Sequence, residues 1–316
     1  MRAIVTAALL TSLSLPASAQ VVTESETPTG PLILQLQAGT RALSMGGAYM
    51  ITAPDADGIF YNPQLLSAAR GFSLSTQRFG SAATLATFAA ALDANVGFGV
   101  QVLDYELPMF HTAEAIGSPA ALSRGGGLTA SEAVAMLGYA RTIKGVRLGI
   151  AGKWAHHWSG DYSAGAGAVD VGSSINPLNW LMVALSVQNL GGDFSIGPSD
   201  YKLPMMGTLL VTQRPRPIGP LDISLSGRVS AGPDVDTFGA VGADLGYWPF
   251  TGLTFAARAG LRFGTMTHRL NPIDSRVEQG MFTAGGGVTW QRVTLDYAWE
   301  PFQNADDSHR IGLRIR

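Results

Sequence analysis

Strict alternation of apolar and polar side chains over nine or more residues is the feature that most constrains the fold of this chain. Successive side chains of a β-strand point to opposite faces, so the pattern predicts strands. These runs exceed the roughly five or six residues typical of globular sheets and match the roughly 9–11 residues that cross a bilayer with tilt. In residues 253–263, for example, one face carries Leu253, Phe255, Ala257, Ala259, Leu261 and Phe263, and the other carries Thr254, Arg258, Gly260 and Arg262.

Fourteen segments from residue 71 onward fit this pattern. Single-chain bacterial barrels have an even number of antiparallel strands. We therefore predict an all-β fold, a 14-stranded antiparallel transmembrane β-barrel. The expected strands are 71–79, 82–92, 94–106, 129–142, 145–157, 163–172, 179–190, 203–213, 220–230, 236–247, 252–264, 279–290, 292–300 and 308–315.

Loop lengths and tryptophan positions predict the two ends of the barrel. The second, fourth and twelfth connections are tight, whereas the third, seventh and eleventh (107–128, 191–202 and 265–280) are long. The short first connection, at Gly80-Ser81, is an exception to this parity. Amphipathic rings prefer the headgroup level, so two girdles are expected. The tryptophans fall near strand ends in two groups: Trp180, Trp248 and Trp290 on the short-turn side, and Trp154, Trp158 and Trp299 on the long-loop side.

The first residues have the pattern of an export signal. Arg2 precedes an apolar stretch from Ala3 to Leu15, and Ala17-Ser18-Ala19 is a small-residue cleavage motif. No later segment has the roughly 20 mainly apolar residues of a spanning helix. Charged residues make up only 14% of the chain, so part of its surface is expected to face lipid. We predict a signal peptide at 1–19, an N-terminal segment with a luminal hatch at 20–70, and a barrel at 71–316 in the bacterial outer membrane.

The strand faces predicted to point into the lumen carry charges of both signs. Two interpretations are open: a lumen neutralised by ion pairs and water, or a charged translocation path. The first is favoured, because unpaired buried charge is costly. The predicted luminal charges are Arg147, Lys153, Asp222, Arg228, Asp244, Arg258, Arg262, Asp296 and Glu300.

Residues 20–70 do not alternate, and part of 32–70 is expected to fold inside the barrel with a short helix near Pro63 to Ala68. A lumen of fourteen strands has room for such a hatch, because about eight strands are already filled by side chains alone. Paired glycines permit positive φ and close approach to the wall, and Asn-Pro favours a turn. Packing of the hatch without ligand contact is the simpler alternative to a ligand-binding role. The candidate hatch residues are Gly39, Arg41, Met45, Gly46, Gly47, Asp55, Asp57, Tyr61, Asn62 and Pro63.

Two blocks of this segment, AGTRALSMGGAY at 38–49 and DADGIFYNP at 55–63, resemble the opening of the PorV/PorQ family. That family is similar to the wider FadL-like group of fourteen-stranded barrels with an N-terminal hatch. SVQNLG at 186–191, YKLP at 201–204, ARAG at 257–260, TLDYA at 294–298 and HRIGL at 309–313 add to the resemblance. The chain departs from the family pattern at Ser44, Phe60, Gln64-Leu65 and the C-terminal Arg316.

The resemblance implies passive uptake or binding of hydrophobic small molecules by a barrel surrounded by outer-membrane lipid. Leu107, Met109 and Phe110 are the candidate ligand entry, in an apolar stretch of the third connection; contact with lipid headgroups is the alternative. A second reading of the resemblance is a PorV-like partner of a type IX secretion system that receives cargo proteins. A purely structural barrel is the third.

The sequence offers no catalytic or metal site. There is no Cys, no G-x-S-x-G motif, and a net charge of −2 that gives no case for nucleic acid. His156 and His157 could suggest a metal site, but adjacent strand residues point to opposite faces. We therefore expect an interfacial or loop pair. We therefore predict no enzyme activity and no cofactor.

Overall fold

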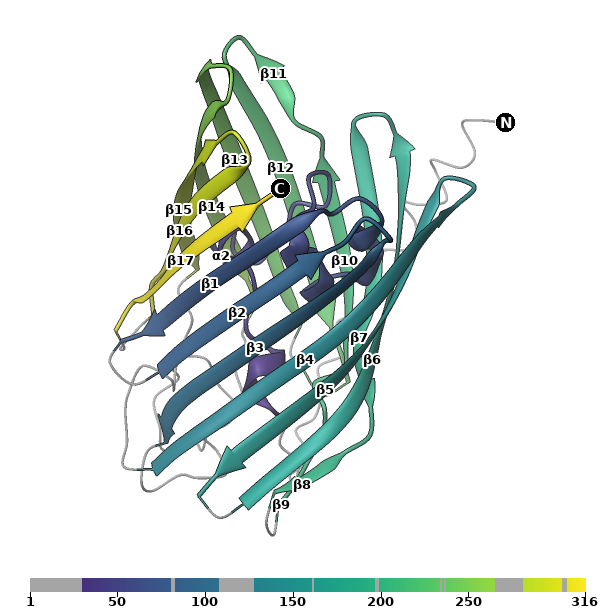
Figure 1. Cartoon of the computed structure of the whole chain (residues 1–316), viewed down its shortest axis with the longest axis vertical. Helices are drawn as coiled ribbons and strands as arrows, with labels where there is room; N and C mark the ends of the chain where they lie inside the picture. Colours follow the sequence, from purple (N-terminus) through teal and green to yellow (C-terminus); the bar gives the residue numbers. More distant parts are fainter. Residues whose placement is uncertain are drawn as a thin grey trace.

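A computed structural model describes residues 30–80, 83–107, 128–160, 162–196, 199–233, 235, 237–264, 281–302 and 306–316. Within these residues the chain forms one closed antiparallel sheet, in which β1 pairs with β17 and β10 pairs with β12 (Figure 1). The fourteen-stranded barrel predicted from the sequence is confirmed. Its wall consists of β1 (Gly71–Phe79), β2 (Ala83–Ala91), β3 (Val96–Leu107), β4 (Leu128–Ile143), β5 (Val146–Ser159), β6 (Tyr162–Leu178), β7 (Leu181–Gly191), β10 (Met206–Gln213), β12 (Leu221–Ala231), β13 (Phe238–Phe250), β14 (Leu253–Phe263), β15 (Phe282–Trp290), β16 (Val293–Glu300) and β17 (Ser308–Ile315).

The outer face of the wall is apolar and the inner face is mixed. In β14 the Phe255, Leu261 and Phe263 side chains are exposed on the outside, whereas Arg258 and Arg262 are buried inside. The predicted alternation is confirmed there. An apolar outer face suits lipid, and a closed barrel leaves no unpaired strand edge in the hydrocarbon region. The protein is therefore an outer-membrane barrel. No helix in the described part of the chain is long and apolar enough to cross a membrane.

Several elements differ from the predicted ranges. Strand β6 continues to Leu178 through Asn176 and Pro177, which the sequence marks as turn formers. At this end β6 stands beyond the wall with both faces exposed, so the lack of a proline donor costs little. Trp154 is an interior residue of β5, so its predicted place near a strand end is wrong. Short strands occupy connections predicted as loops: β8 (Phe194–Ile196), β9 (Ser199–Tyr201) and β11 (Arg216–Ile218).

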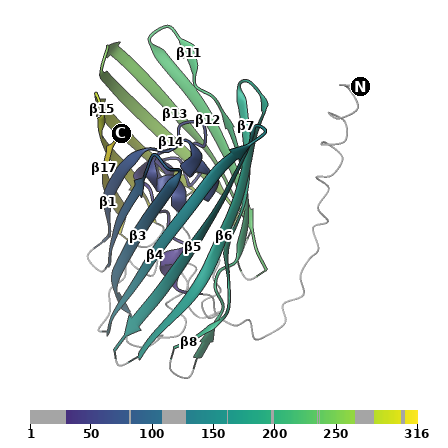
Figure 2. The ribbon, with the colours of Figure 1, turned by 45° about the vertical axis from the view of Figure 1, so that its right-hand side comes forward.

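The two ends of the barrel differ in their connections. We call the end with the connections 92–95, 144–145, 179–180, 214–220, 251–252 and 291–292 the short-turn end, and the opposite one the long-loop end. The C-terminus lies at the short-turn end, toward the top of Figures 1 and 2. Bacterial barrels place short turns in the periplasm, which orients the long-loop end outward.

Residues 30–70, called the inner segment below, run inside the barrel from the long-loop end to the short-turn end (Figure 1). At its start the Gly30 N–H donates to the Lys202 carbonyl oxygen, and at its end the chain enters β1. The segment contains only short helices: η1 (Leu32–Leu34), α2 (Thr40–Ser44), η2 (Ala56–Phe60) and η3 (Pro63–Ser67). The last of these lies where a short helix was expected.

Glycines on the inner face of the wall let the inner segment approach the strands closely. A Cβ atom on Gly149 would lie 2.1 Å from the Gln64 backbone nitrogen, and one on Gly260 would lie 2.1 Å from that of Gly46. Both contacts are backbone to backbone, so a side chain at either position has no space. At seven other inward glycines a Cβ atom would lie within 3 Å of an inner-segment atom, in each case nearest to a side-chain atom of that segment: Gly97, Gly99, Gly138, Gly172, Gly242, Gly285 and Gly312.

Side chains of the wall also satisfy backbone carbonyls that the short helices leave unpaired. Arg262 donates to the Gly46 carbonyl oxygen (3.2 Å), and Gln188 donates to that of Phe60 (2.7 Å). Arg310 donates to the carbonyl oxygen of Gln37. Buried backbone groups without partners are costly. The irregular inner segment is therefore stable only inside this wall.

Replacing an inward glycine tests this fit. Gly149→Val is expected to destabilise the barrel by about 1–3 kcal/mol, as overpacking does, because its side chain would overlap the backbone of residues 63–64. The matched control is Gly152→Val on the same strand, where a Cβ meets nothing within 4 Å. Urea unfolding of both variants in lipid vesicles measures the difference. Equal stabilities would contradict the close fit.

Candidate functional site in the barrel lumen

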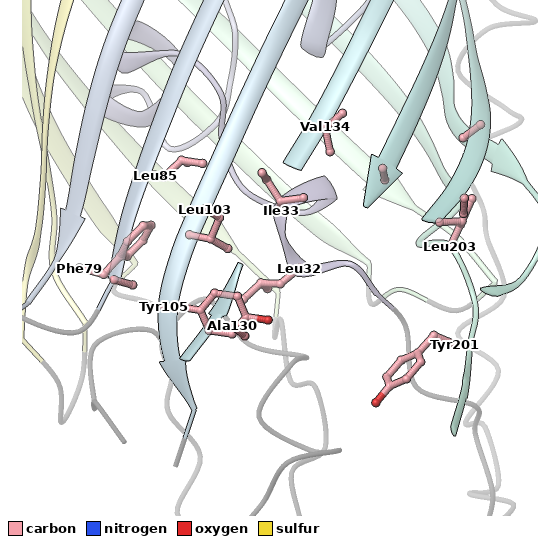
Figure 3. Close-up of a cluster of buried hydrophobic side chains, with 14 of the residues drawn as sticks. Leu32, Ile33, Phe79, Leu85, Leu103, Tyr105, Ala130, Val134, Tyr201 and Leu203 are labelled. Atoms are coloured by element: carbon pink, nitrogen blue, oxygen red, sulfur yellow. The ribbon is translucent and has the colours of Figure 1, made fainter. Parts of the chain in front are cut away.

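The part of the lumen toward the long-loop end is an apolar chamber (Figure 3). Barrel interiors of this class are ordinarily polar, so a buried apolar cluster here is unusual. Alanines on β4, β5 and β6 leave space that Leu32 and Ile33 of the inner segment fill, and both of these side chains are fully buried. The wall residues of the chamber are Phe79, Ala83, Leu85, Leu103, Tyr105, Ala130, Val134, Ala155, Ala166, Ala168, Tyr201, Leu203 and Phe302.

One buried carboxylate holds the inner segment in this chamber. Glu132 accepts a hydrogen bond from the Ile33 backbone N–H at 2.7 Å and another from the Tyr105 hydroxyl at 3.0 Å. Its other neighbour is His157 Nδ1, also at 3.0 Å. Glu132 and His157 are both fully buried. The sequence analysis missed Glu132, although alternation from Thr129 onward places this residue on the inner face. The expectation that His157 lies at an interface or in a loop was wrong.

A small cavity of about 40 Å³ adjoins the chamber. Residues 34–38 of the inner segment form one side of it, and Phe60 and Tyr61 contribute further. Lys153 and Arg228 are its cationic members, while Val134 is shared with the chamber. The chamber and this cavity thus form a continuous region that the start of the inner segment lines or fills.

Toward the short-turn end, six ionised side chains alternate in sign around a closed ring, called the charge ring below. Arg314 Nε donates to Asp296 (2.6 Å) and its Nη1 donates to Asp55 (2.9 Å). On the far side, Arg258 bridges Asp296 (2.7 Å) and Asp244 (3.0 Å). Arg41 closes the ring, 3.4 Å from Asp244 and 4.0 Å from Asp55.

The charge ring joins the inner segment to the wall. Two of its members, Arg41 and Asp55, belong to the inner segment, and the others come from β13, β14, β16 and β17. Burial acts to raise the pKa of Asp55, but Arg314 and Arg41 outweigh it and hold the pKa below its ordinary value. Asp55 therefore remains ionised. Arg314 was missed from the sequence, although it alternates inward in the run 308–315.

The other predicted luminal charges are mostly paired. Lys153 contacts Asp170 and Asn189, both at 2.7 Å, and Arg262 is paired with Glu300. Arg228 donates to the Ser230 hydroxyl and lies over the Phe238 ring. Two predicted charges lie instead near the short-turn end and are only partly buried, namely Arg147 and Asp222. This arrangement fits a lumen neutralised by ion pairs, and the role of these residues in transport stays a prediction.

The remaining predicted hatch residues are also buried in the inner segment. The Tyr61 hydroxyl accepts the Gly39 N–H at 2.8 Å, and its ring stacks on Tyr49. Gly46 and Gly47 have φ of +69° and +91°, the conformation that glycine favours. Met45 packs against Gly242, Asn62 donates to the Leu185 carbonyl oxygen, and Pro63 begins η3.

Asp57 is the inner-segment carboxylate outside the ring. It accepts a hydrogen bond from the Ser73 hydroxyl, and Gly39 passes beside it. Burial raises the pKa of Asp57 from its usual value to about 7, and the charge of Asp55 adds to the effect. The pKa values of Asp55 and Asp57 are thus shifted in opposite directions, although the two residues are close in sequence.

The structure describes only one of the three candidate entry residues. Leu107 is the last residue of β3, and Met109 and Phe110 lie outside the described residues. In the described part of the chain, no three His, Asp or Glu residues gather as a metal site.

Neither the known protein-family models nor the curated proteins give a match to this chain. Solved structures do. The Ralstonia pickettii toluene transporter TbuX aligns over 88% of this chain and 98% of its own, with TM-score 0.51 and 13% identity. The chain has the fold of these channels. Two further similar FadL-like barrels are the CymD monoaromatic hydrocarbon channel (TM-score 0.54, 10% identity, 88% and 96% covered) and a Pseudomonas aeruginosa FadL homologue (0.50, 9%, 88% and 97%).

The charge ring predicts a large cost for removing one member. Arg314→Met is expected to destabilise this FadL-like barrel by about 3–5 kcal/mol, because it leaves Asp55 and Asp296 buried with less compensation. Arg314→Met combined with Asp55→Asn is expected to cost less than the sum of the two single changes. Urea unfolding in vesicles measures both, with Arg78→Met on the exposed face of β1 as the control. Additive effects would contradict a coupled ring.

The raised pKa of Asp57 predicts that the stability of the protein depends on pH. Its folded-state pKa is raised to about 7, so between about pH 4 and 7 the folded state holds a proton that an Asp in the unfolded chain, with its ordinary pKa of about 3.9, has released. Stability is therefore expected to fall as pH rises from about 4 to 7 and then to level off. Asp57→Asn should remove this part of the profile, whereas Asp93→Asn, at a fully exposed carboxylate, should keep it. A profile that Asp57→Asn leaves unchanged would contradict the assignment.

Proposed function

We propose that this protein carries hydrophobic small molecules across the outer membrane by passive uptake. The observation that carries the proposal is the apolar chamber inside the long-loop end of the barrel, where the class ordinarily has polar residues. The similar structures are described as toluene transporters and hydrocarbon channels, which supports the same kind of ligand here.

Uptake would begin with capture at the long-loop end and partition into the chamber. The ligand would take the place of Leu32 and Ile33, which are the parts of the chamber that do not belong to the wall or its loops. Replacing these apolar side chains by an apolar ligand leaves the apolar area that is buried in the chamber nearly unchanged. Displacement then requires breaking the Ile33 N–H bond to Glu132 and the Gly30 N–H bond to the Lys202 carbonyl oxygen.

Only the start of the inner segment is placed for such a movement. The inward glycines of the wall meet inner-segment residues between Thr40 and Leu66, and none of them meets residues 30–36. The charge ring likewise engages the segment at Arg41 and Asp55. We therefore expect residues 30–36 to move as the hatch while the remainder stays in place.

A cavity variant tests the proposal. Removing both tethered side chains, Leu32→Ala with Ile33→Ala, leaves empty apolar space, which binds hydrophobic molecules. The expected result is tighter binding of the fluorescent hydrophobe N-phenyl-1-naphthylamine to the purified protein, and faster uptake of radiolabelled toluene by cells that produce the variant. Ile51→Ala is the matched control, because Ile51 is equally buried but belongs to a separate cluster.

Two outcomes would overturn the proposal. The first is toluene uptake that is the same in cells with and without the wild-type protein. The second is probe affinity that rises as much in Ile51→Ala as in the chamber variant, because the chamber would then have no special role.

The resemblance of residues 38–49 and 55–63 to PorV supports a second candidate, reception of cargo proteins for type IX secretion. In the structure Arg41, Asp55 and Tyr61 of these blocks hold the inner segment together and to the wall, which gives the motif a packing role. Type IX components and cargo encoded in the same genome would favour this candidate over uptake.

A further inference from the structure

The accessible charges at the short-turn end are predominantly positive. Eight Lys and Arg side chains are exposed or partly exposed there, against the three carboxylates of Asp93, Asp222 and Asp244, and every barrel turn at this end is described. Arg70 is paired with Asp93, 3.0 Å away. The eight cations are Arg70, Arg141, Lys144, Arg147, Arg214, Arg216, Arg292 and Arg316.

The long-loop end has the opposite balance among its described residues. Only Arg78 and Lys202 are accessible cations there. Six carboxylates accompany them, namely Asp104, Glu106, Asp193, Asp200, Asp306 and Asp307. The net charge of the whole chain is close to neutral, so this separation is a property of the fold and not of composition.

The cations at the short-turn end surround the barrel. One group lies at the β4–β5 turn, a second at the β10–β12 connection, and a third where β16 and β17 meet β1. Two strands lie between the first group and the second, three between the second and the third, and two between the third and the first around the closed sheet. A single docked protein would meet one patch, whereas a lipid leaflet meets all three groups at once.

Two of these cations point toward lipid. Arg141 pairs in register with Leu148 on the outer face of β4 and β5, next to the exposed Tyr139. Arg216 pairs with Ile223 on the outer face of β12. Among the described residues, neither arginine has a carboxylate within salt-bridge distance, and the same holds for Lys144 and Arg292.

We propose that this basic girdle binds the phosphate headgroups of anionic phospholipids in the leaflet that the short-turn end contacts. Exposed Lys and Arg beside a membrane are attracted to anionic headgroups, and the attraction adds over several residues. Trp180, Trp248 and Trp290 lie at the same end and are exposed, which sets the headgroup level at this height of the wall.

The test measures which lipid surrounds the whole protein. Electron paramagnetic resonance of the reconstituted full chain gives the association constant of spin-labelled phosphatidylglycerol relative to phosphatidylcholine. The wild type is expected to favour phosphatidylglycerol by about twofold or more at low salt, with the preference falling in molar salt because screening shortens the range of the charges. The variant with Arg141→Gln, Lys144→Gln, Arg216→Gln and Arg292→Gln should lose the preference.

The control is Arg78→Gln, which removes an exposed outward cation at the opposite end and should leave the preference unchanged. If the fourfold variant does not insert, Arg141→Gln with Lys144→Gln alone should lower the preference partially. No preference in the wild type, or equal loss in Arg78→Gln, would overturn the proposal. Binding of soluble polyglutamate without phosphatidylglycerol enrichment would also overturn it and assign the girdle to a soluble acidic partner.

Discussion

The inner segment keeps its position because ionised side chains inside the barrel alternate in sign around the charge ring. Each ring carboxylate contacts two arginines, so the burial of six charges leaves none without compensation. Arg41 and Asp55 supply one third of the ring from a segment that has almost no regular structure. The ring therefore fixes the position of the segment along the barrel axis, and the contacts on either side of it follow from that position.

Glycine placement divides the lumen into two parts that are packed differently. Where glycines line the wall, backbone approaches backbone, as at Gly149 and Gly260, and the inner segment has no freedom to shift. In the apolar chamber, alanines such as Ala155 and Ala166 line the wall instead. Side chains of the inner segment fill the space, and hydrogen bonds of its backbone to Glu132 and to the Lys202 carbonyl hold them there. The same segment is thus held backbone to backbone at one end, whereas at the other end the proposed uptake would exchange its side chains for a ligand.

The wall could be predicted from the sequence because alternation is a local property, and the inward position of residues such as Arg258 and Asp296 follows from it. The same rule would have placed Glu132, Asp170, Arg310 and Arg314, which were overlooked rather than unpredictable. Pairing is different: that Asp55 meets Arg314, 259 residues later, depends on closure of the barrel and on the path of the inner segment. The predicted end of β6 was wrong because Asn176 and Pro177 favour a turn locally. The sequence does not show that the strand continues beyond the lipid-facing wall, where both of its faces are exposed.

Strand β17 closes the barrel against β1 and also supplies Arg314, Arg310 and the Gly312 site that faces Thr40. The same strand therefore closes the barrel and contacts the inner segment. Closure of the sheet and completion of the charge ring are thus a single event, because Arg314 contacts Asp55 and Asp296 from the strand that pairs with β1 and β16.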